Sequence, residues 1–283
     1  MPVGVPGRPG CFPGPFGVPE LPEVEAYRRL AEAAVGRRIE EVEAPDAWYL
    51  KRGLDAGTVR DALIGESITG ARRIGKVLLL DTGPAGPTLG VRFGMTGRLV
   101  LDGVPGVDAL LYSSNAADPA WDRFAVQLAS ARRQPASRLA VRDPRRLGGI
   151  ELDPDESRLG PDALTVGTAA LRAALAGSSA PLKARLLDQA HLAGVGNLIA
   201  DEVLWRAGLD PERPAGGLTD GEVRKLARTL RETIAELVRR GGSHRGDLIS
   251  ERRPGGHCPR DGRPLIKRTI GGRTTWSCPY HQR

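Results

Sequence analysis

The sequence predicts an α+β protein in which a β-rich half precedes a helical half, and three observations lead to this class. Short runs rich in aliphatic and β-branched residues alternate with turns from residue 39 to about residue 152. Helical hydrophobic spacing replaces them from residue 164 to Gly242. A basic tail with paired Cys, Asp and His residues follows. The chain has 283 residues and is 40% hydrophobic, which is sufficient for two cores.

The first predicted element is an amphipathic helix in the stretch "LPEVEAYRRLAEAAVG". Its apolar positions recur at helical spacing, at Val24, Tyr27, Ala31 and Ala34. Pro22 suits the first turn, and Gly36 predicts the end of the helix. The preceding residues 1–17 are broken by repeated Pro and Gly and lack the continuous apolar segment of a secretory signal. We expect this leader to be disordered or non-native.

The order of these patterns predicts the domain organisation. The β-type runs form one domain, and the acidic stretch "ELDPDESRLGPDA" (151–163) reads as the linker that ends it. The expected parts are a leader, a β domain, a helical domain and a C-terminal hairpin module, with the boundaries 1–17, 18–153, 154–242 and 243–283.

The helical half contains the glycine-rich turn "AGVGN" (193–197) between two helical patterns. A helix that starts directly after glycines presents unpaired N–H groups and a positive dipole end, which suit a phosphate group. An ordinary helix connection has the same sequence pattern. On the residues alone, both interpretations stay open.

Charge and cysteine content restrict the partners and the compartment. The chain has 41 Lys and Arg against 34 Asp and Glu, a net charge of +7, which favours a polyanion such as nucleic acid. Three cysteines are too few for a disulfide framework, so a reducing cytoplasm is expected. No apolar run reaches the roughly 18 residues of a membrane span, so no membrane partner is expected.

The C-terminal stretch "HCPRDGRPLIKRTIGGRTTWSCPYHQ" holds two short knuckles around a hairpin-like middle. Their spacings are C-x-x-D and C-x-x-H, which predict one structural zinc ion. The candidate ligands are Cys258, Asp261, Cys278 and His281. Asp is uncommon in structural zinc sites, so His257 is an alternative to Asp261, and a metal-free hairpin is the alternative to a zinc site.

Seven motifs occur in the order found in one enzyme family: "PELPEVE", "RRIGK", "RFGMTGR", "DPRRLG", "LGPDAL", "AGVGN" and the terminal knuckles. In them the chain, from about Val18 to Arg283, resembles the formamidopyrimidine-DNA glycosylases and endonuclease VIII enzymes of base excision repair. The resemblance implies an N-terminal β-sandwich with flanking helices, a helix-two-turn-helix domain and a zinc-finger β-hairpin. It also implies a monomeric, nucleoid-associated bacterial enzyme that flips oxidised or ring-opened bases out of double-stranded DNA. As an abasic-site (AP) lyase, such an enzyme cleaves the strand by β- or β,δ-elimination.

Four residues match the catalytic residues of that family. Pro19 matches the N-terminal proline whose amine attacks C1′ and forms a Schiff base, and an α-amino group with a pKa of roughly 8 is partly unprotonated at neutral pH. Glu20 matches the general acid, although a carboxylate at a helix start is equally good as local structure. Lys76 matches the lysine that contacts the phosphate and assists β-elimination. Arg273 matches the finger arginine that grips phosphates and serves δ-elimination.

Six further residues match DNA-binding residues of the family. Those matching backbone contacts, which position a duplex without reading its sequence, are Arg92, Lys183 and Asn197. Met95 and Arg145 match two of the three side chains that fill the gap left by a flipped base. Leu147 stands where the third is commonly Phe, so apolar filling remains while stacking is weakened.

Two departures from the family pattern leave questions open. Only fifteen residues separate Gly242 from Cys258, fewer than in the formamidopyrimidine branch, whose lesion-capping loop lies there. We therefore expect the loop that closes over 8-oxoguanine to be absent. Oxidised pyrimidines, ring-opened purines and abasic sites all stay open as substrates.

The second departure is that Pro19 follows a leader, because an amide nitrogen has no free electron pair for attack on C1′. The Arg-heavy composition indicates a GC-rich gene, and such genes often start at GTG, which reads as Val internally. Initiation at Val18 followed by removal of Met would make Pro19 the N-terminus. If the leader is retained, the alternative function is a lyase-dead protein that binds damaged DNA.

Overall fold

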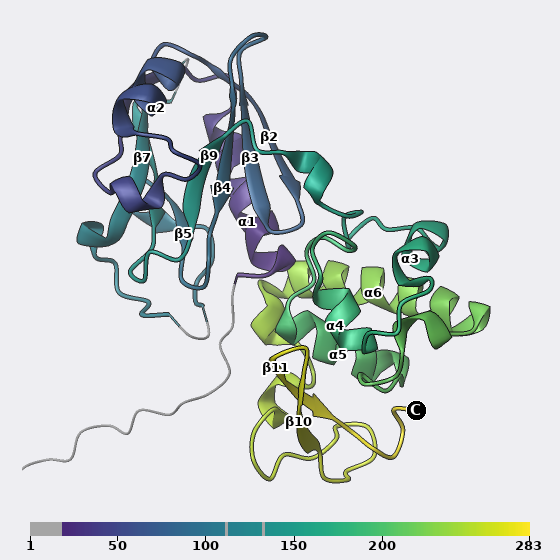
Figure 1. The fold of residues 1–283 in the computed structure, drawn as a ribbon. Coiled ribbons are helices and arrows are strands. Elements are labelled where there is room, and N and C mark those ends of the chain that lie inside the picture. The colour runs from purple at the N-terminus through teal and green to yellow at the C-terminus, as the bar shows by residue number, and fades with distance from the viewer. Residues whose placement is uncertain (1–18, 111–112, 132–133) are drawn as a thin grey trace, which may run out of the picture.

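The computed structural model describes residues 19–110, 113–131 and 134–283 (Figure 1). Its α-helices are α1 (Leu21–Ala31), α2 (Ala56–Leu63), α3 (Thr168–Leu175), α4 (Leu182–Leu187), α5 (Asn197–Ala207) and α6 (Asp220–Arg240). Its strands are β1 (Ile39–Glu43), β2 (Ile68–Ile74), β3 (Val77–Thr82), β4 (Thr88–Arg92), β5 (Arg98–Leu101), β6 (Val104–Pro105), β7 (Asp122–Leu128), β8 (Ser137–Arg142), β9 (Gly149–Leu152), β10 (Ile266–Ile270) and β11 (Arg273–Ser277). The predicted leader, residues 1–17, lies outside the described residues.

Two antiparallel sheets form the N-terminal half. One has the strand order β1-β7-β8-β5-β6 and the other β2-β3-β4-β9. Their apolar faces share one core, to which Ile39 and Phe124 contribute from the first sheet and Leu78 and Val91 from the second. Helix α1 packs against β2 and β5, and α2 packs against β1. The predicted β-sandwich with flanking helices is confirmed.

Helix α1 forms where the helical spacing predicts it. The four apolar positions of the prediction are all fully buried: Val24, Tyr27, Ala31 and Ala34. A 3-10 turn continues α1 to Ala34, and Gly36 then takes the left-handed conformation with φ 81°. The Tyr27 hydroxyl donates to the carbonyl oxygen of Gly97 at 3.2 Å. These contacts fix α1, from Val24 onward, against the sandwich.

Helices α3 to α6 enclose a second core, as the periodicity predicts. The longest of them, α6, starts with a capping box between Thr219 and Glu222 and ends at Gly241 in the left-handed conformation. Leu21, the first residue of α1, belongs to this second core, and α1 contacts α6. Helix α1 therefore packs on both halves of the molecule. Within the described residues, no helix is both long and apolar enough to cross a membrane.

The C-terminal hairpin pairs β10 with β11 in antiparallel register, with Ile270 opposite Arg273. A small third core joins Trp205 of α5 to Leu248, Trp276 and the two cysteines Cys258 and Cys278. The hairpin consequently packs on α5, and Figure 1 shows it (yellow) against the helical half rather than against the sandwich.

Candidate active site

A cavity of about 170 Å³ lies where α1 begins. Its lining comes from the second residue ahead of α1, the β2–β3 hairpin, the end of β4, and two segments of the helical half: Pro19, Lys76, Val77, Arg92, Phe93, Gly94, Leu159 and Gln189. Both halves of the molecule therefore contribute walls. Three residues singled out by the resemblance, Pro19, Lys76 and Arg92, line this one cavity.

Glu20, next to Pro19, is fully buried against the first turn of α5. Its carboxylate accepts hydrogen bonds from the backbone N–H groups of Leu198 at 2.7 Å and Ile199 at 3.0 Å. These donors have no partner within the helix, and the helix dipole adds positive potential there. Burial raises the pKa of Glu20, while the charge of Lys76 and the two N–H groups oppose the shift. A carboxyl group with a raised pKa can hold a proton and deliver it.

The glycines of "AGVGN" make room for this carboxylate. A Cβ atom at Gly196 would lie 2.1 Å from Cδ of Glu20. One at Gly194, whose φ is 111°, would lie 2.5 Å from Cδ1 of Leu21. The helix start expected to hold a phosphate or merely to connect two helices thus receives a carboxylate of the chain itself, and two of its N–H groups are occupied.

Lys76 lies in the two-residue turn between β2 and β3. The neighbouring Gly75 has φ 56°, and a Cβ atom there would lie 2.8 Å from Cβ of Ala193, so the hairpin tip rests on the "AGVGN" turn. Asp162 pins the hairpin by accepting hydrogen bonds from the backbone N–H of Gly75 at 2.7 Å and from Nη1 of Arg73 at 2.5 Å. The position of Lys76 is therefore set by both halves.

The electrostatic environment of Lys76 links the cavity to the C-terminal hairpin. Burial lowers the pKa of Lys76, the carboxylates of Glu20 and Glu23 oppose this, and the charge of Arg273 lowers it further. Arg273 is exposed at the start of β11. A Cβ atom at the preceding Gly271 would lie 2.9 Å from α4, so the hairpin tip rests on that helix. The charge of Lys76 therefore interacts both with Glu20 in the cavity and with Arg273 on the hairpin.

Two candidate DNA-binding residues, Asn197 and Arg92, lie next to these charged residues: Asn197 precedes Leu198, whose N–H binds Glu20, and Arg92 lines the cavity with Lys76. Asn197 begins α5, is 9% exposed, and its Oδ1 has no hydrogen-bond partner among the described residues. Turning the amide by 180° would place a donor there, which suits a phosphate oxygen. Arg92 lines the cavity, and its Nε donates to Glu151 at 2.9 Å.

Asp143 connects the two loops that carry Met95, Arg145 and Leu147. We call these three residues, which are expected to fill the gap left by a flipped base, the wedge candidates. Its fully buried carboxylate accepts hydrogen bonds from Oγ1 of Thr96 at 2.5 Å and from the backbone N–H groups of Leu147 and Gly148, both at 2.9 Å. We call residues 143–148 the wedge loop. Because Thr96 follows Met95, one carboxylate fixes the turn at Met95 and the wedge loop together.

The three wedge candidates are accessible on these loops. Leu147 is 48% exposed, an unusual position for a large apolar side chain, and Arg145 is exposed beside it. Met95 is half-buried and belongs to none of the cores. The structure therefore brings Met95, Arg145 and Leu147 to one region but leaves them outside the packed interior.

Lys183 departs from its expected role. It is fully buried, its Nζ lies 2.7 Å from Oδ1 of Asp201, and it donates to Oγ1 of Thr275 at 2.8 Å. Arg252 binds the other carboxylate oxygen of Asp201 at 2.8 Å. A direct contact with a DNA phosphate does not fit this placement, because the ammonium group is enclosed and hydrogen-bonded within the protein. Lys183 instead joins α4 to the β11 strand that begins at Arg273.

The C-terminal knuckles converge on one point. Ligand atoms of four residues lie within 4.8 Å of one another: Cys258, Asp261, Cys278 and His281. His257 is not part of this group, and its side chain is exposed. Nε2 of His281 lies 3.1 Å from the carbonyl oxygen of Trp205, which leaves Nδ1 facing the group. Two thiols, an imidazole and a carboxylate fit a tetrahedral zinc ion.

Sequence reasoning missed the buried carboxylates that assemble the site. Glu23 accepts hydrogen bonds from the backbone N–H of Glu20 at 2.9 Å and of Ser243 at 2.6 Å, and so ties α1 to the turn after α6. Asp143 and Asp162 do the same for the wedge loop and the β2–β3 hairpin. The available signal was their place beside Pro or Gly in "PELPEVE", "DPRRLG" and "LGPDAL", where acidic side chains accept hydrogen bonds from turn N–H groups.

Comparison with protein families identifies the family of this chain. The model of the formamidopyrimidine-DNA glycosylase N-terminal domain matches residues 18–150, and the model of the H2TH domain of the same glycosylase matches residues 159–247. The chain belongs to the formamidopyrimidine-DNA glycosylase and endonuclease VIII family. This membership places it among the DNA glycosylases of repair.

Individual members of the family are similar over nearly the whole chain. The formamidopyrimidine-DNA glycosylase of Alkalilimnicola ehrlichii is 35% identical, with 94% of this chain and 100% of the relative covered. The solved structure of MutM (Fpg) from Thermus thermophilus is 33% identical with a TM-score of 0.74, covering 93% of this chain and 98% of that one. The Lactococcus lactis Fpg in complex with DNA containing an abasic site is 27% identical with a TM-score of 0.75, covering 93% and 99%.

Proposed function

We propose that this chain is a bifunctional base excision repair enzyme: a DNA glycosylase that removes a damaged base and an AP lyase that then cleaves the strand. One observation carries the proposal. Pro19 lines a cavity with Lys76, directly beside the buried carboxyl group of Glu20. A nucleophile, a carboxyl group with a raised pKa and an amine with a lowered pKa are the groups that the reaction requires.

In the proposed reaction, the amine of an N-terminal Pro19 attacks C1′ of the damaged nucleotide and loses its proton. The bond from C1′ to the base breaks, and the base departs with the bonding electron pair and takes up a proton. Opening of the sugar ring then breaks the C1′–O4′ bond, and Glu20 supplies the proton that O4′ takes up. The product is an iminium ion. It accepts the electron pair released when C2′ loses a proton, and the C3′–O bond breaks with departure of the phosphate. Lys76 and Arg273 are proposed to neutralise the phosphates around this position.

The proposed partner is damaged double-stranded DNA. Arg92, Asn197 and Arg273 would hold its backbone, while Met95 and the wedge loop would fill the gap left by the flipped nucleotide. The Lactococcus lactis relatives solved with DNA containing an abasic site or Fapy-dG support this assignment. We propose that one monomer suffices, because one chain supplies all of these groups.

The choice of lesion is proposed from the segment between Gly242 and Cys258. It contains two 3-10 turns, Ser243–Arg245 and Ile249–Glu251, and neither a strand nor an α-helix. This supports a site without a lesion-capping loop. Ring-opened purines, abasic sites and oxidised pyrimidines are therefore the substrates to compare first, with 8-oxoguanine as the substrate expected to be poor.

A structural zinc ion is proposed at Cys258, Asp261, Cys278 and His281. When bound, it would stabilise the small third core and with it the hairpin that carries Arg273. One zinc per chain is the expected content.

The state of the Pro19 nitrogen decides between two functions. The printed chain has residues ahead of Pro19, and with them attached the nitrogen is an amide that cannot attack C1′. Initiation at Val18 followed by Met removal would free it. The chain that retains its leader would be a damaged-DNA-binding protein without lyase activity.

The test is borohydride trapping on a duplex with one abasic site, using the chain that starts at Pro19 and the 283-residue chain that starts at Met1. The Pro19-start protein is expected to form a covalent adduct, and the 283-residue chain is not. Glu20→Gln should reduce the adduct, whereas Pro87→Ala, in the distant turn between β3 and β4, should not. No adduct from protein whose Pro19 N-terminus is verified by mass spectrometry refutes the lyase proposal. Equal adduct from both forms refutes Pro19 as the nucleophile.

A further inference from the structure

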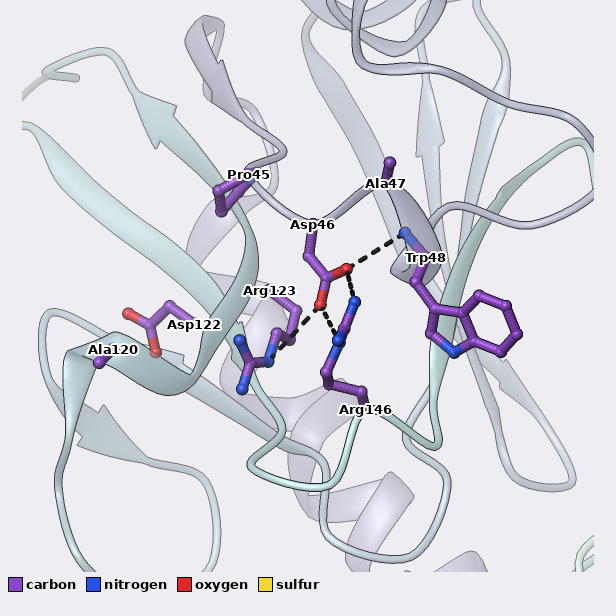
Figure 2. Close-up of a pocket in the computed structure, with 8 residues that line it drawn as sticks. All are labelled: Pro45, Asp46, Ala47, Trp48, Ala120, Asp122, Arg123 and Arg146. Carbon is purple, nitrogen blue, oxygen red and sulfur yellow. Dashed lines mark hydrogen bonds and ion pairs between the residues drawn. The ribbon is translucent and has the colours of Figure 1, made fainter.

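An ion pair between Arg146 and Asp46 holds the wedge loop. Asp46 belongs to none of the sequence motifs and takes no part in the proposed catalytic chemistry. Arg146 donates to Asp46 from Nε and from Nη2, both at 2.6 Å, one to each carboxylate oxygen. The same carboxylate accepts a hydrogen bond from the backbone N–H of Trp48 at 3.1 Å. Figure 2 shows Asp46 between the guanidinium groups of Arg146 and Arg123, with Trp48 turned away. A two-bond pair of this kind fixes orientation as well as distance.

The conformation of Arg146 explains why such a contact is needed. Its φ is 58°, in the left-handed region that residues other than glycine rarely adopt. A backbone of this kind persists only where the surrounding contacts hold it. Arg146 lies between Arg145 and Leu147, so its unusual conformation sets the direction of both wedge residues. The ion pair acts on the one residue of the loop that is strained.

Further contacts connect Asp46 to the rest of the loop. Nε of Arg123 lies 3.8 Å from Asp46 and donates to the carbonyl oxygen of Asp143 at 2.9 Å. The adjoining 3-10 turn, Ala47–Tyr49, backs the end of the loop: a Cβ atom at Gly148 would lie 2.3 Å from the hydroxyl oxygen of Tyr49. Asp46 is therefore part of a rigid support behind the loop.

The negative charge of Asp46 indicates that this residue has a specific role. A carboxylate near a DNA-binding surface repels phosphates, so its presence weakens binding unless it does something else. Arg146 is 48% exposed in its side chain, whereas that of Asp46 is 9% exposed. A buried carboxylate that holds a half-exposed arginine withdraws this arginine from general phosphate binding.

We propose that Asp46 is a positioning residue for the wedge: its ion pair with Arg146 locks the wedge loop in the conformation that projects Arg145 and Leu147. This inference rests on the proposed function, because it assigns the lock to the base-flipping step. The competing interpretation is that Arg146 leaves Asp46 to grip a phosphate. The two make opposite predictions, since the carboxylate speeds flipping in the first case and competes with DNA in the second.

The variant Asp46→Asn keeps the size of the side chain and removes its charge. Flipping is followed by the fluorescence of 2-aminopurine opposite a single lesion in a stopped-flow mixer, and binding to undamaged duplex is measured separately. We expect the flipping rate to fall about tenfold or more, in line with the roughly hundredfold effect of misplacing a reacting group by 1 Å. Binding to undamaged DNA should be unchanged or tighter. General loss of structure would weaken both.

The matched control is Asp55→Asn, which removes the same charge at a helix cap where Asn serves equally well. It should flip bases at the wild-type rate. The reversed pair, Asp46→Arg with Arg146→Asp, should recover part of the loss. Arg146→Lys, which keeps the charge but cannot form both bonds, should show an intermediate rate. A flipping rate in Asp46→Asn equal to or above that of the wild type overturns the proposal.

Hydrogen exchange of residues 145–148 in protein without DNA tests the lock independently of any activity. Asp46→Asn should speed exchange of the Leu147 and Gly148 amides, which the wild type protects through Asp143. Unchanged exchange overturns the lock even if the wild type is inactive on every lesion. A wild type that neither flips nor cleaves, with faster exchange in the variant, refutes the proposed function and leaves the lock standing as a structural device.

Discussion

Replacing Gly196 by Ala tests how the helical half builds the active site. The added Cβ would lie 2.1 Å from Cδ and 2.4 Å from Oε1 of Glu20, far inside contact distance. The φ of Gly196 is −116°, which an alanine adopts without strain, so the clash is the only perturbation. The carboxylate must move away from α5 and give up its bonds to Leu198 and Ile199.

The size of the effect follows from those two bonds. A hydrogen bond contributes about 0.5–1.5 kcal/mol to a neutral acceptor and about 1.5–3 kcal/mol to a charged one, so losing both should lower the free energy of unfolding by about 1–3 kcal/mol after partial relaxation. Because the proposed proton donor is displaced, the single-turnover rate of strand cleavage should fall by about 10²–10⁴. Urea denaturation measures the first quantity, and denaturing electrophoresis of a duplex with one ring-opened purine measures the second.

Two controls isolate the cause. Gly217→Ala adds the same atom in the same domain, but its nearest neighbour, Cβ of Pro214, is 3.9 Å away, so rate and stability should match the wild type within about 0.5 kcal/mol. In a Glu20→Ala background the space is empty, and adding Gly196→Ala should then cost less than about 1 kcal/mol. A Gly196→Ala protein that cleaves at the wild-type rate, or an undiminished cost in the Glu20→Ala background, would refute the reasoning.

Three further predictions concern buried charges and the metal. Lys183→Ala should lower the free energy of unfolding by about 3 kcal/mol, because Asp201 keeps only Arg252 as its ion-pair partner. The salt dependence of DNA binding, which a lost phosphate contact reduces by about 0.9 in slope, should not change. Because burial raises the pKa of Glu20, the stability that its protonation contributes is complete below the ordinary value of 4.5 and is lost as pH rises through the raised value; Glu20→Gln should flatten this dependence in urea titrations from about pH 4 to 8. Elemental analysis should find one zinc per chain, and Cys278→Ser should abolish it and speed proteolysis of the C-terminal hairpin.

The sequence predicted well those elements that a regular spacing of residues indicates. The apolar positions from Val24 to Ala34 recur at helical spacing, and all four are buried. The C-x-x-D and C-x-x-H spacings led to four residues whose ligand atoms do converge. The helical positions lie within one short segment, and each zinc knuckle is itself a local pattern, although Cys258 and His281 are 23 residues apart and are brought together by the hairpin between them.

The rest depends on partners that are far apart in the sequence. The turn "AGVGN" was correctly recognised as a helix start, but nothing near it in the sequence indicates that Glu20 would occupy its N–H groups. Lys183 was expected to contact the DNA backbone, and its burial could not be foreseen because its partners Asp201 and Thr275 come from two later elements. The lock on Arg146 comes from Asp46, one hundred residues earlier. Such pairings follow from the packing of domains, which a local pattern does not contain.

The dependence of the site on both halves has a consequence for the mechanism. Leu21 is packed in the helical core while Val24 and Tyr27 are packed in the sandwich, so the two residues ahead of α1 lie at the junction between the domains. The carboxylate of Glu20 is held by α5, and the tip of the Lys76 hairpin rests on the turn before α5. A change in the angle between the halves would therefore shift the carboxylate of Glu20, which α5 holds, relative to Lys76 and the sandwich wall of the cavity. If DNA contacts both halves, as we propose, the rate of strand cleavage should depend on how completely the duplex engages both of them. DNA without a lesion, or DNA whose gap the wedge candidates do not fill, would then leave Glu20 and Lys76 misaligned.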